Sequence, residues 1–178
     1  MRIIGGAFKG RKFTPPAKNW PTRPTTDFAK EGLFNILLNR IDLEDIKMLD
    51  LFGGTGNHCY ECISRGCTDA TYVDKHRACV QFVTKTAQTL QIEDRIKIMQ
   101  ADVFKFLQRS NQQYDYIFAD PPFDLPKVEM IPDLIFEKGL LKEDGLFVLE
   151  HGPNKGFEKH ERYESERSYG KIVFSFFR

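Results

Sequence analysis

The stretch Leu49–Gly56, LDLFGGTG, decides the fold of this chain, because a short apolar run ends there in a glycine-rich turn. Its glycines allow the backbone to turn tightly and to approach a ligand closely. The residues after Gly56 read as a helix, whose first N–H groups would point at that ligand. A dinucleotide-binding turn would carry a third glycine where Cys59 stands, which disfavours that class. A tight turn without any ligand remains the alternative.

Apolar runs alternate with helical patterns from residue 46 onward, which is typical of a mostly parallel sheet with helices on both faces. The segment HERYESERSYGKIVFSFFR predicts an antiparallel hairpin around Tyr169-Gly170 at the sheet edge. Ahead of the sheet, Thr26 or Asp27 can cap a helix whose apolar residues recur at helical spacing. The predicted strands are 47–52, 70–74, 95–100, 114–119 and 145–150, and the predicted helices between them are 57–65, 76–90, 103–110 and 127–138.

Length and composition favour one globular domain spanning residues 1–178. A chain of 178 residues can bury one substantial core, and its 13% aromatic content argues against disorder. No apolar run approaches the roughly 20 residues of a membrane span. The N-terminus MRIIGGAFKG has too short an apolar part for a signal peptide. We therefore expect a cytoplasmic protein with no membrane partner.

Basic residues gather at the N-terminus. Residues 1–26 carry six cations and no acid, so the rest of the chain carries −5 by difference from the net charge of +1. This imbalance predicts contact with a polyanion such as a nucleic acid, and a solvated basic hairpin is the alternative. Residues 2–13 read as a glycine-turned hairpin and residues 15–27 as an ordered loop. The predicted phosphate contacts are Arg2, Lys9, Arg11, Lys12 and Arg23.

Three carboxylates stand at the ends of successive predicted strands. Asp50 precedes the glycines, Asp74 closes ATYVD and Asp102 closes IMQAD. Ligands of parallel sheets bind outside the carboxyl ends of the strands, so the three should face one crevice. Asp50 could accept from an ammonium group and Asp74 from two ribose hydroxyls, while Asp102 could either accept from an adenine amino group or cap a helix.

The stretch YIFADPPF begins as a buried strand and then stops pairing, because two prolines remove two backbone donors and exclude helix at Asp120. The Asp120 carboxylate and the carbonyls beside it could accept two hydrogen bonds from an exocyclic amine. Pro121 would fix that backbone, and Phe123 would stack on the ring that carries the amine. The alternative is that the prolines merely end the strand and Phe123 packs in the core.

The cysteines and His58 are candidates for metal-binding, redox or catalytic roles. A C-x-x-C pair with two unevenly spaced single cysteines is a weak match to a zinc site, and a redox pair is possible. Packing as small buried hydrophobes is favoured, so no metal is expected. His58 lies beside the glycine turn, and a packing or capping role is favoured over catalysis. The four cysteines are Cys59, Cys62, Cys67 and Cys79.

Taken together, these motifs resemble class I methyltransferases that use S-adenosylmethionine and act on amino nitrogens. More closely, the chain resembles the bacterial small-subunit ribosomal RNA guanine-N2 methyltransferases along nearly its whole length. That resemblance rests on MRIIGGAFKGR, TRPTTDFAKEGLFNIL, LDLFGGTG followed by SRG, and FADPPF. Two positions depart from the family pattern: Phe28 replaces a basic residue, and Asn57-His58-Cys59 replaces a small apolar stretch with another glycine.

The resemblance implies a Rossmann-like, seven-stranded class I methyltransferase fold that binds S-adenosylmethionine. It implies methylation of N2 of a guanine in 16S ribosomal RNA, within a small-subunit particle. A DNA adenine-N6 methyltransferase and a non-catalytic RNA-binding assembly factor are the alternatives. The base would be held by Asp120, Pro121 and Phe123, and the cofactor by Asp50, Gly54, Gly56, Asp74 and Asp102.

Overall fold

The computed structural model describes residues 1–16 and 26–178. Its centre is one seven-stranded sheet with the strand order β3-β2-β1-β4-β5-β7-β6. The first five strands run parallel, and β7 pairs antiparallel with both β5 and β6. The predicted mostly parallel sheet with a C-terminal antiparallel hairpin is therefore confirmed. The strands are β1 Lys47–Leu51, β2 Asp69–Asp74, β3 Ile96–Gln100, β4 Tyr114–Ala119, β5 Leu141–His151, β6 Tyr163–Tyr169 and β7 Ile172–Phe177.

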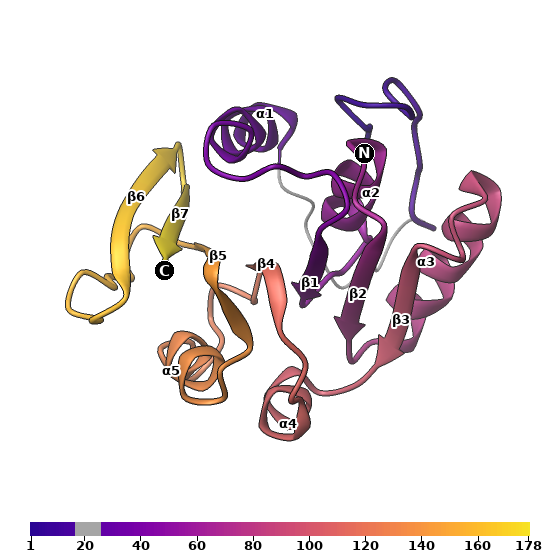
Figure 1. Cartoon of the computed structure of the whole chain (residues 1–178). Helices are drawn as coiled ribbons and strands as arrows, with labels where there is room; N and C mark the ends of the chain where they lie inside the picture. Colours follow the sequence, from indigo (N-terminus) through magenta and orange to yellow (C-terminus); the bar gives the residue numbers. More distant parts are fainter. Residues whose placement is uncertain (17–25) are drawn as a thin grey trace.

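Helices cover both faces of the sheet (Figure 1). One layer holds α1 Asp27–Leu37, α2 Asn57–Ser64 and α3 Arg77–Leu90, and the other holds α4 Val103–Arg109 and α5 Met130–Glu137. Each layer shares its own cluster of buried apolar side chains with the sheet. Strand residues alternate between these clusters, so that Met48 faces one and Leu49 the other. Burial on both faces explains why β1, β2 and β4 read as mostly apolar runs.

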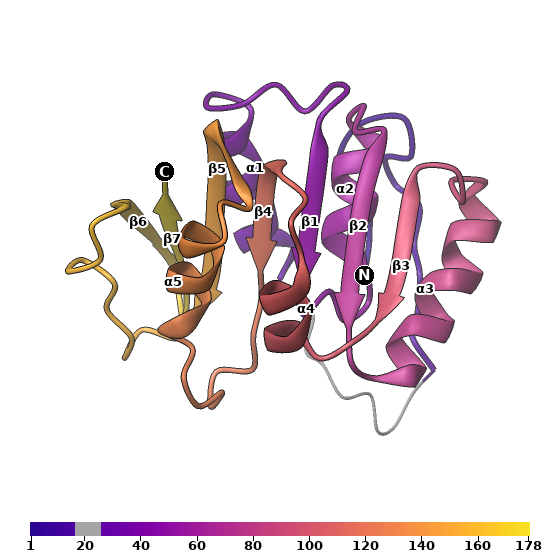
Figure 2. The same cartoon turned by 60° about the horizontal axis from the view of Figure 1, so that its bottom comes forward.

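The strand order reverses between β1 and β4, and this reversal creates the crevice. Because β1 to β4 are parallel, the loops that follow them open at the same edge of the sheet (Figure 2). A reversal point of this kind is where open parallel sheets bind ligands. The residues after β1, β2, β3 and β4 therefore define the part of the molecule in which a site is expected.

Helix α1 begins as its sequence predicts. The Thr26 hydroxyl accepts a hydrogen bond from the backbone N–H of Ala29 at 3.2 Å, which identifies Thr26 as the N-cap. Leu33, Phe34 and Leu37 are buried against the sheet. Leu38 lies beyond the last helical residue and is 57% exposed.

The N-terminal segment forms a reduced hairpin that lies on α2. Backbone hydrogen bonds join its arms, such as that from the Ile3 N–H to the Arg11 carbonyl at 2.9 Å, but the antiparallel bridge is confined to Arg2 and Lys12, so neither arm is a full strand. Gly6 adopts a φ of 73°, and a Cβ there would lie 1.8 Å from the carbonyl oxygen of Ser64. This close approach to α2 requires glycine. Residues 17–25 of the predicted ordered loop lie outside the described residues.

The four cysteines are free and buried. Burial raises the pKa of Cys67 to about 11 and that of Cys79 to about 12, so the thiols stay protonated. A protonated buried thiol is a poor redox nucleophile. The structure therefore favours the packing role over the redox alternative. Across the described ranges, no helix combines the length and apolar character needed to cross a membrane.

Candidate active site

A cavity of about 770 Å³ opens at the carboxyl ends of β1 to β5. Its volume lies in the range of small-molecule and cofactor sites. Gly56 does not belong to its lining, so the expectation of a direct ligand contact there is not supported. The predicted site residues that do line the cavity are Asp50, Gly54, Asp74, Asp102, Asp120, Pro121 and Phe123.

The glycine turn is shaped by its neighbours. Gly56 is the N-cap of α2 with a φ of 73°, and a Cβ there would lie 2.7 Å from the Tyr60 hydroxyl. Its role is therefore conformational. The backbone N–H of Gly54 donates to Asp74 Oδ2 at 3.0 Å, and its carbonyl accepts from the Tyr72 hydroxyl at 2.8 Å. These bonds hold the turn against β2 and leave its backbone facing the cavity.

Asp50 is a buried carboxylate with unused bonding capacity. It is 1% exposed, and its Oδ2 accepts from Cys59 Sγ at 3.3 Å. Its Oδ1 has no hydrogen-bond partner among the described residues. Burial, which is the largest cause, raises the pKa of Asp50 to about 7. A buried acceptor left unpaired is costly, so this site suits a ligand that brings a cationic donor.

Asp74 is already partly engaged. Its Oδ2 accepts from Gly54, and its Oδ1 accepts from the backbone N–H of His76 at 2.8 Å and faces His76 Nδ1 at 3.0 Å. A carboxylate offers about four acceptor positions, so one stays open while the His76 ring is in place. The His76 side chain is 40% exposed, which leaves room for the ring to turn away. Accepting from two ribose hydroxyls would then become possible.

Asp74, His76 and Cys79 bring three potential ligand atoms within 4.8 Å of one another, the single such metal-type group among the described residues. Asp74 and His76 already contact each other, and the thiol of Cys79 is protonated. A protonated thiol must lose its proton before it binds a metal ion. The expectation that the site needs no metal stays a prediction.

Asp102 caps α4, since its Oδ1 accepts from the backbone N–H of Lys105 at 3.0 Å. It also lines the cavity. Of the two roles considered for this residue, capping is observed. The other carboxylate oxygen is the one that could serve a ligand.

Asp120 lies at the point where β4 leaves the sheet. Its backbone N–H still donates to the carbonyl of Leu51 at 3.2 Å, and the two prolines then end the pairing. Burial raises the pKa of Asp120 well above its ordinary value, and the charges of Glu150 and Asp50 raise it further. Glu150 lines the cavity from the end of β5. The sequence analysis missed it, although Glu150 closes the predicted strand 145–150 as Asp74 closes its own strand.

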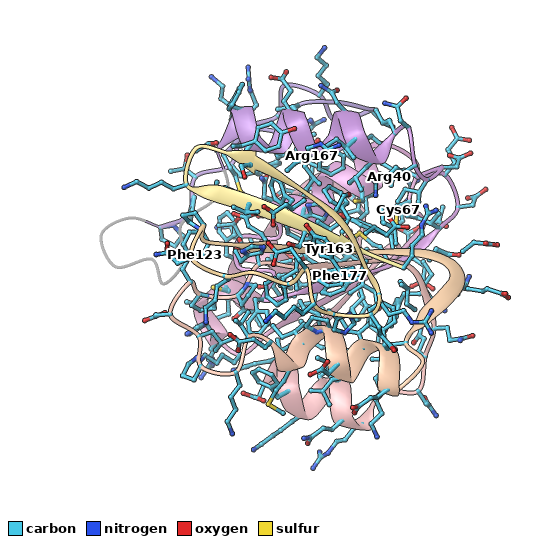
Figure 3. The ribbon with its side chains drawn as sticks, turned by 90° about the vertical axis from the view of Figure 1, so that its left-hand side faces the viewer. Arg40, Cys67, Phe123, Tyr163, Arg167 and Phe177 are labelled. Carbon is cyan, nitrogen blue, oxygen red and sulfur yellow. The ribbon has the colours of Figure 1, made fainter. Side chains whose placement is uncertain are left out.

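Phe123 lies on the rim of the cavity. It is 50% exposed, which contradicts the alternative that it packs in the core. Its ring passes close to Gly152, where a Cβ would lie 3.3 Å from the ring edge. In Figure 3, Phe123 lies toward the same side of the molecule as the turn of the β6–β7 hairpin, and both line the cavity. An exposed ring at this position can stack on a planar ligand.

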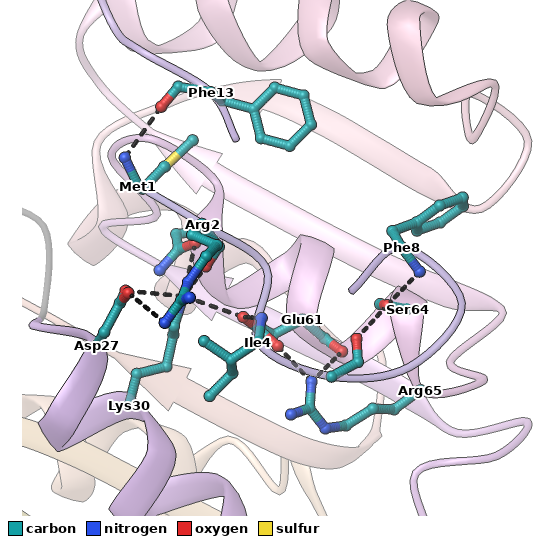
Figure 4. A network of polar contacts seen from close by, with 12 residues as sticks. Met1, Arg2, Ile4, Phe8, Phe13, Asp27, Lys30, Glu61, Ser64 and Arg65 are labelled. Atoms are coloured by element: carbon teal, nitrogen blue, oxygen red, sulfur yellow. Dashed lines mark hydrogen bonds and ion pairs between the residues drawn. The ribbon is translucent and has the colours of Figure 1, made fainter. Parts of the chain in front are cut away.

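Lys30 contributes a buried cation to the cavity wall. It is 2% exposed, and its Nζ lies 2.9 Å from Glu61 Oε1 and 3.3 Å from Asn57 Oδ1 (Figure 4). It also donates to the carbonyl of Arg2. The sequence analysis missed Lys30, although the signal was present, since Lys30 continues the apolar stripe of Leu33 and Leu37 at helical spacing.

His58 lines the cavity and is otherwise buried in the core. Its Nε2 lies 2.8 Å from the Tyr116 hydroxyl, and its ring stacks on Phe118 with a centroid distance of 3.7 Å. Burial, reinforced by the charges of Lys30 and Arg65, lowers the pKa of His58 well below its ordinary value. A neutral, stacked ring supports the packing role over general-base catalysis.

The basic residues of the N-terminal arm lie outside the cavity lining. Arg2 forms an ion pair with Asp27 at 3.1 Å. Lys9, Arg11 and Lys12 are exposed and form no ion pair within the part of the chain that the structure describes. They are therefore available to an external anion. Arg23 lies outside the described residues.

Comparison with known proteins identifies the family. The model of the family described as Conserved hypothetical protein 95 matches residues 1–178. The chain belongs to this family. It is 34% identical over 154 residues to "Putative rRNA methyltransferase YlbH" of Bacillus subtilis, covering 85% of this chain and 82% of the relative. It is 33% identical over 156 residues to "Ribosomal RNA small subunit methyltransferase D" of Escherichia coli, covering 88% and 77%.

The fold of this Conserved hypothetical protein 95 member agrees with that assignment. A solved structure described as "Putative methyltransferase yhhF from Escherichia coli" superposes with a TM-score of 0.85 at 29% identity, covering 99% of this chain and 96% of the other. The predictions of the family, of the class I fold and of an S-adenosylmethionine-dependent methyltransferase are confirmed. The non-catalytic alternative is correspondingly disfavoured.

Proposed function

We propose that this methyltransferase modifies the exocyclic N2 amine of a guanine in small-subunit ribosomal RNA, with an assembled or assembling small-subunit particle as its substrate. The relatives named as ribosomal RNA methyltransferases support the RNA class. The motif Asp120–Phe123 at the end of β4 supports an exocyclic amine as the acceptor of the methyl group. A ribosomal RNA substrate would make this a cytoplasmic enzyme that works without a membrane.

The feature that supports the proposal most directly is the position of Asp120–Phe123. These residues line the same cavity as Asp50, Asp74 and Asp102. An amine held at the end of β4 would therefore lie beside whatever those carboxylates hold. Methyl transfer depends on such alignment of donor and acceptor more than on acid–base groups.

The residues at the ends of β1 to β3 fit S-adenosylmethionine. The unpaired Oδ1 of Asp50 would accept from the cofactor's ammonium group, and Asp74 would accept from its ribose hydroxyls. Asp102 would accept from the adenine amino group with the oxygen that does not cap α4. When bound, the cofactor supplies an electrophilic methyl group on a sulfonium.

The end of β4 would hold the acceptor. The Asp120 carboxylate and the neighbouring backbone carbonyls would accept both N–H bonds of the amine, which aims the nitrogen lone pair away from them. Pro121 fixes that backbone, and Phe123 offers an exposed ring for the guanine to stack on. The methylated amine loses its proton readily, so the neutral His58 is not needed as a base.

The test uses small ribosomal subunits from cells that lack this gene. Incubation with the enzyme and S-adenosylmethionine, followed by nucleoside digestion and mass spectrometry, should yield N2-methylguanosine at one RNA position. Formation of N6-methyladenine in DNA, with no product in the subunits, would favour the DNA alternative and refute the proposal.

A pair of variants tests the assigned role of the motif. Asp120→Ala should lower the single-turnover rate by orders of magnitude and leave cofactor affinity within a few fold, because its partner is the acceptor amine. Asp124→Ala is the matched control, since Asp124 is an exposed carboxylate in the same loop. If Asp120→Ala instead loses cofactor binding and thermal stability together, the motif is structural.

A further inference from the structure

An aromatic pair that none of these roles uses lies beside the mouth of the cavity. Phe28, in the first turn of α1, is 71% exposed, more than any other large apolar side chain of the described residues. It meets Tyr169, the last residue of β6, edge to face with ring centroids 5.7 Å apart and planes at 79°. We call Phe28 and Tyr169 the aromatic ledge.

The aromatic ledge is supported by residues that pack against Tyr169. A Cβ at Gly32, one turn along α1 from Phe28, would lie 2.2 Å from the Tyr169 ring, so only glycine admits that ring. Tyr169 also packs on Phe174 at a centroid distance of 5.9 Å. Because Tyr169 is supported from below, Phe28 is presented on a fixed base with most of its surface open to solvent.

The ledge borders the same cavity as Phe123. Tyr169, Gly170 and Lys171 line the cavity from the hairpin turn, and Thr26 and Lys30 line it from α1. Phe123 lines it from the end of β4. The mouth is therefore flanked by one exposed ring for the target base and by a second aromatic feature supplied by other elements.

The charges around the cavity mouth favour a base over a phosphate inside the cavity. The carboxyl groups that line the cavity, Asp50, Asp74, Asp102, Asp120 and Glu150, disfavour a phosphate there. The one buried lysine of the lining, Lys30, is already paired with Glu61. The exposed Lys171 and Lys75 lie on the rim, where phosphates would be attracted. Asp27, next to Phe28, is neutralised by Arg2 at 3.1 Å and Lys30 at 3.8 Å. A base can thus enter while its backbone stays at the rim.

On these grounds we propose that the aromatic ledge is a second nucleobase subsite, on which the nucleotide next to the target guanine stacks through Phe28. The inference rests on the proposed function and specifies how its substrate is held. A target base that leaves its helical stack exposes the neighbouring base, and aromatic side chains capture such bases without regard to sequence.

The first test compares affinity for RNA with affinity for cofactor. Phe28→Ala should weaken binding to small subunits from gene-deleted cells by about 5- to 150-fold, the equivalent of roughly 1–3 kcal/mol for one stacked base. Binding of S-adenosylmethionine should not change. Phe28→Trp should bind the subunits like the wild type. The matched control is Leu38→Ala, which removes another exposed apolar side chain at the far end of α1.

The second test identifies the occupant. With Phe28→p-benzoylphenylalanine, irradiation of the complex should crosslink the protein to a nucleotide adjacent to the methylated guanine. A crosslink to a ribosomal protein or to distant RNA would overturn the inference, as would wild-type subunit affinity in Phe28→Ala. If Phe28→Ala binds the small subunits with wild-type affinity while the wild-type enzyme forms N2-methylguanosine, the subsite proposal is refuted and the proposed function stands. A wild type that forms none refutes the proposed function and the ledge with it.

Discussion

The pH dependence of cofactor binding offers a sharp test of Asp50. Its pKa is raised from 3.8 to about 7, chiefly by burial. Below pH 7 the unliganded protein therefore holds Asp50 as the neutral acid, whereas a cationic ammonium group binds the carboxylate. Affinity for S-adenosylmethionine should fall as the pH falls through about 7, and binding should release a proton.

The magnitude follows from the fraction of ionised Asp50. With a pKa of about 7, that fraction is near one half at pH 7 and roughly 3% at pH 5.5, so affinity should drop about fifteenfold across this interval. The pH range of the measurement ends at pH 7, because the α-amino group of the cofactor has a pKa of roughly 7.7–8.0 and would itself lose its charge at higher pH. Isothermal titration calorimetry in two buffers of different ionisation enthalpy measures both the affinity and the released proton.

Two variants separate Asp50 from the other groups that line the cavity. Asp50→Asn should bind the cofactor weakly at pH 7 and lose most of the pH dependence. Asp120→Asn leaves the burial of Asp50 and its contact with Cys59 in place, so the dependence should remain. Equal slopes in wild type and Asp50→Asn would refute the assignment of Asp50 to the ammonium group.

Three further predictions concern the cofactor, the arm and the buried ion pair. Asp74→Ala should weaken the binding of S-adenosylmethionine roughly ten- to hundredfold, the equivalent of about 1.5–3 kcal/mol for hydrogen bonds to a charged group. Calorimetry on the folded variant measures this affinity, and an unchanged value would remove Asp74 from the site. Arg11→Ala with Lys12→Ala should flatten the log–log salt dependence of RNA binding by roughly 0.7 to 0.9 per lost phosphate contact, whereas parallel salt series would mean that neither residue meets phosphate. Glu61→Ala should lower the free energy of unfolding in urea by about 3–5 kcal/mol, because it removes the nearest carboxylate from the buried Lys30 and leaves only the more distant Asp27. A loss no larger than that of the exposed control Glu31→Ala would contradict this.

The sheet was predictable because its signals are local and repeated. Apolar runs ending in Gly53 or in Asp120-Pro-Pro mark where strands stop, and parallel pairing then brings those ends to one edge whatever the details of packing. Asp50, Asp74 and Asp102 were found for this reason. Each needed only its position at a strand end.

Other parts of the site depend on contacts between distant segments, which periodicity does not encode. Gly56 belongs to the same motif as Gly54, but only the position of Tyr60 shows that it shapes the turn without lining the cavity. Glu150, by contrast, closes the predicted strand 145–150 and could have been found by its position at a strand end. The aromatic ledge joins Phe28 to a strand residue 141 positions later, and no local pattern links the two.

One buried carboxylate ties the N-terminal arm to the cavity wall. Glu61 accepts from the backbone N–H of Ile4 at 2.6 Å and pairs with Lys30 and Arg65 (Figure 4). Lys30 in turn lines the cavity and donates to the carbonyl of Arg2. Arm and wall thus depend on the same charges, so Glu61→Ala should impair RNA binding and cofactor binding together. The exposed Arg11 and Lys12 take no part in these contacts, and their loss should affect RNA binding alone.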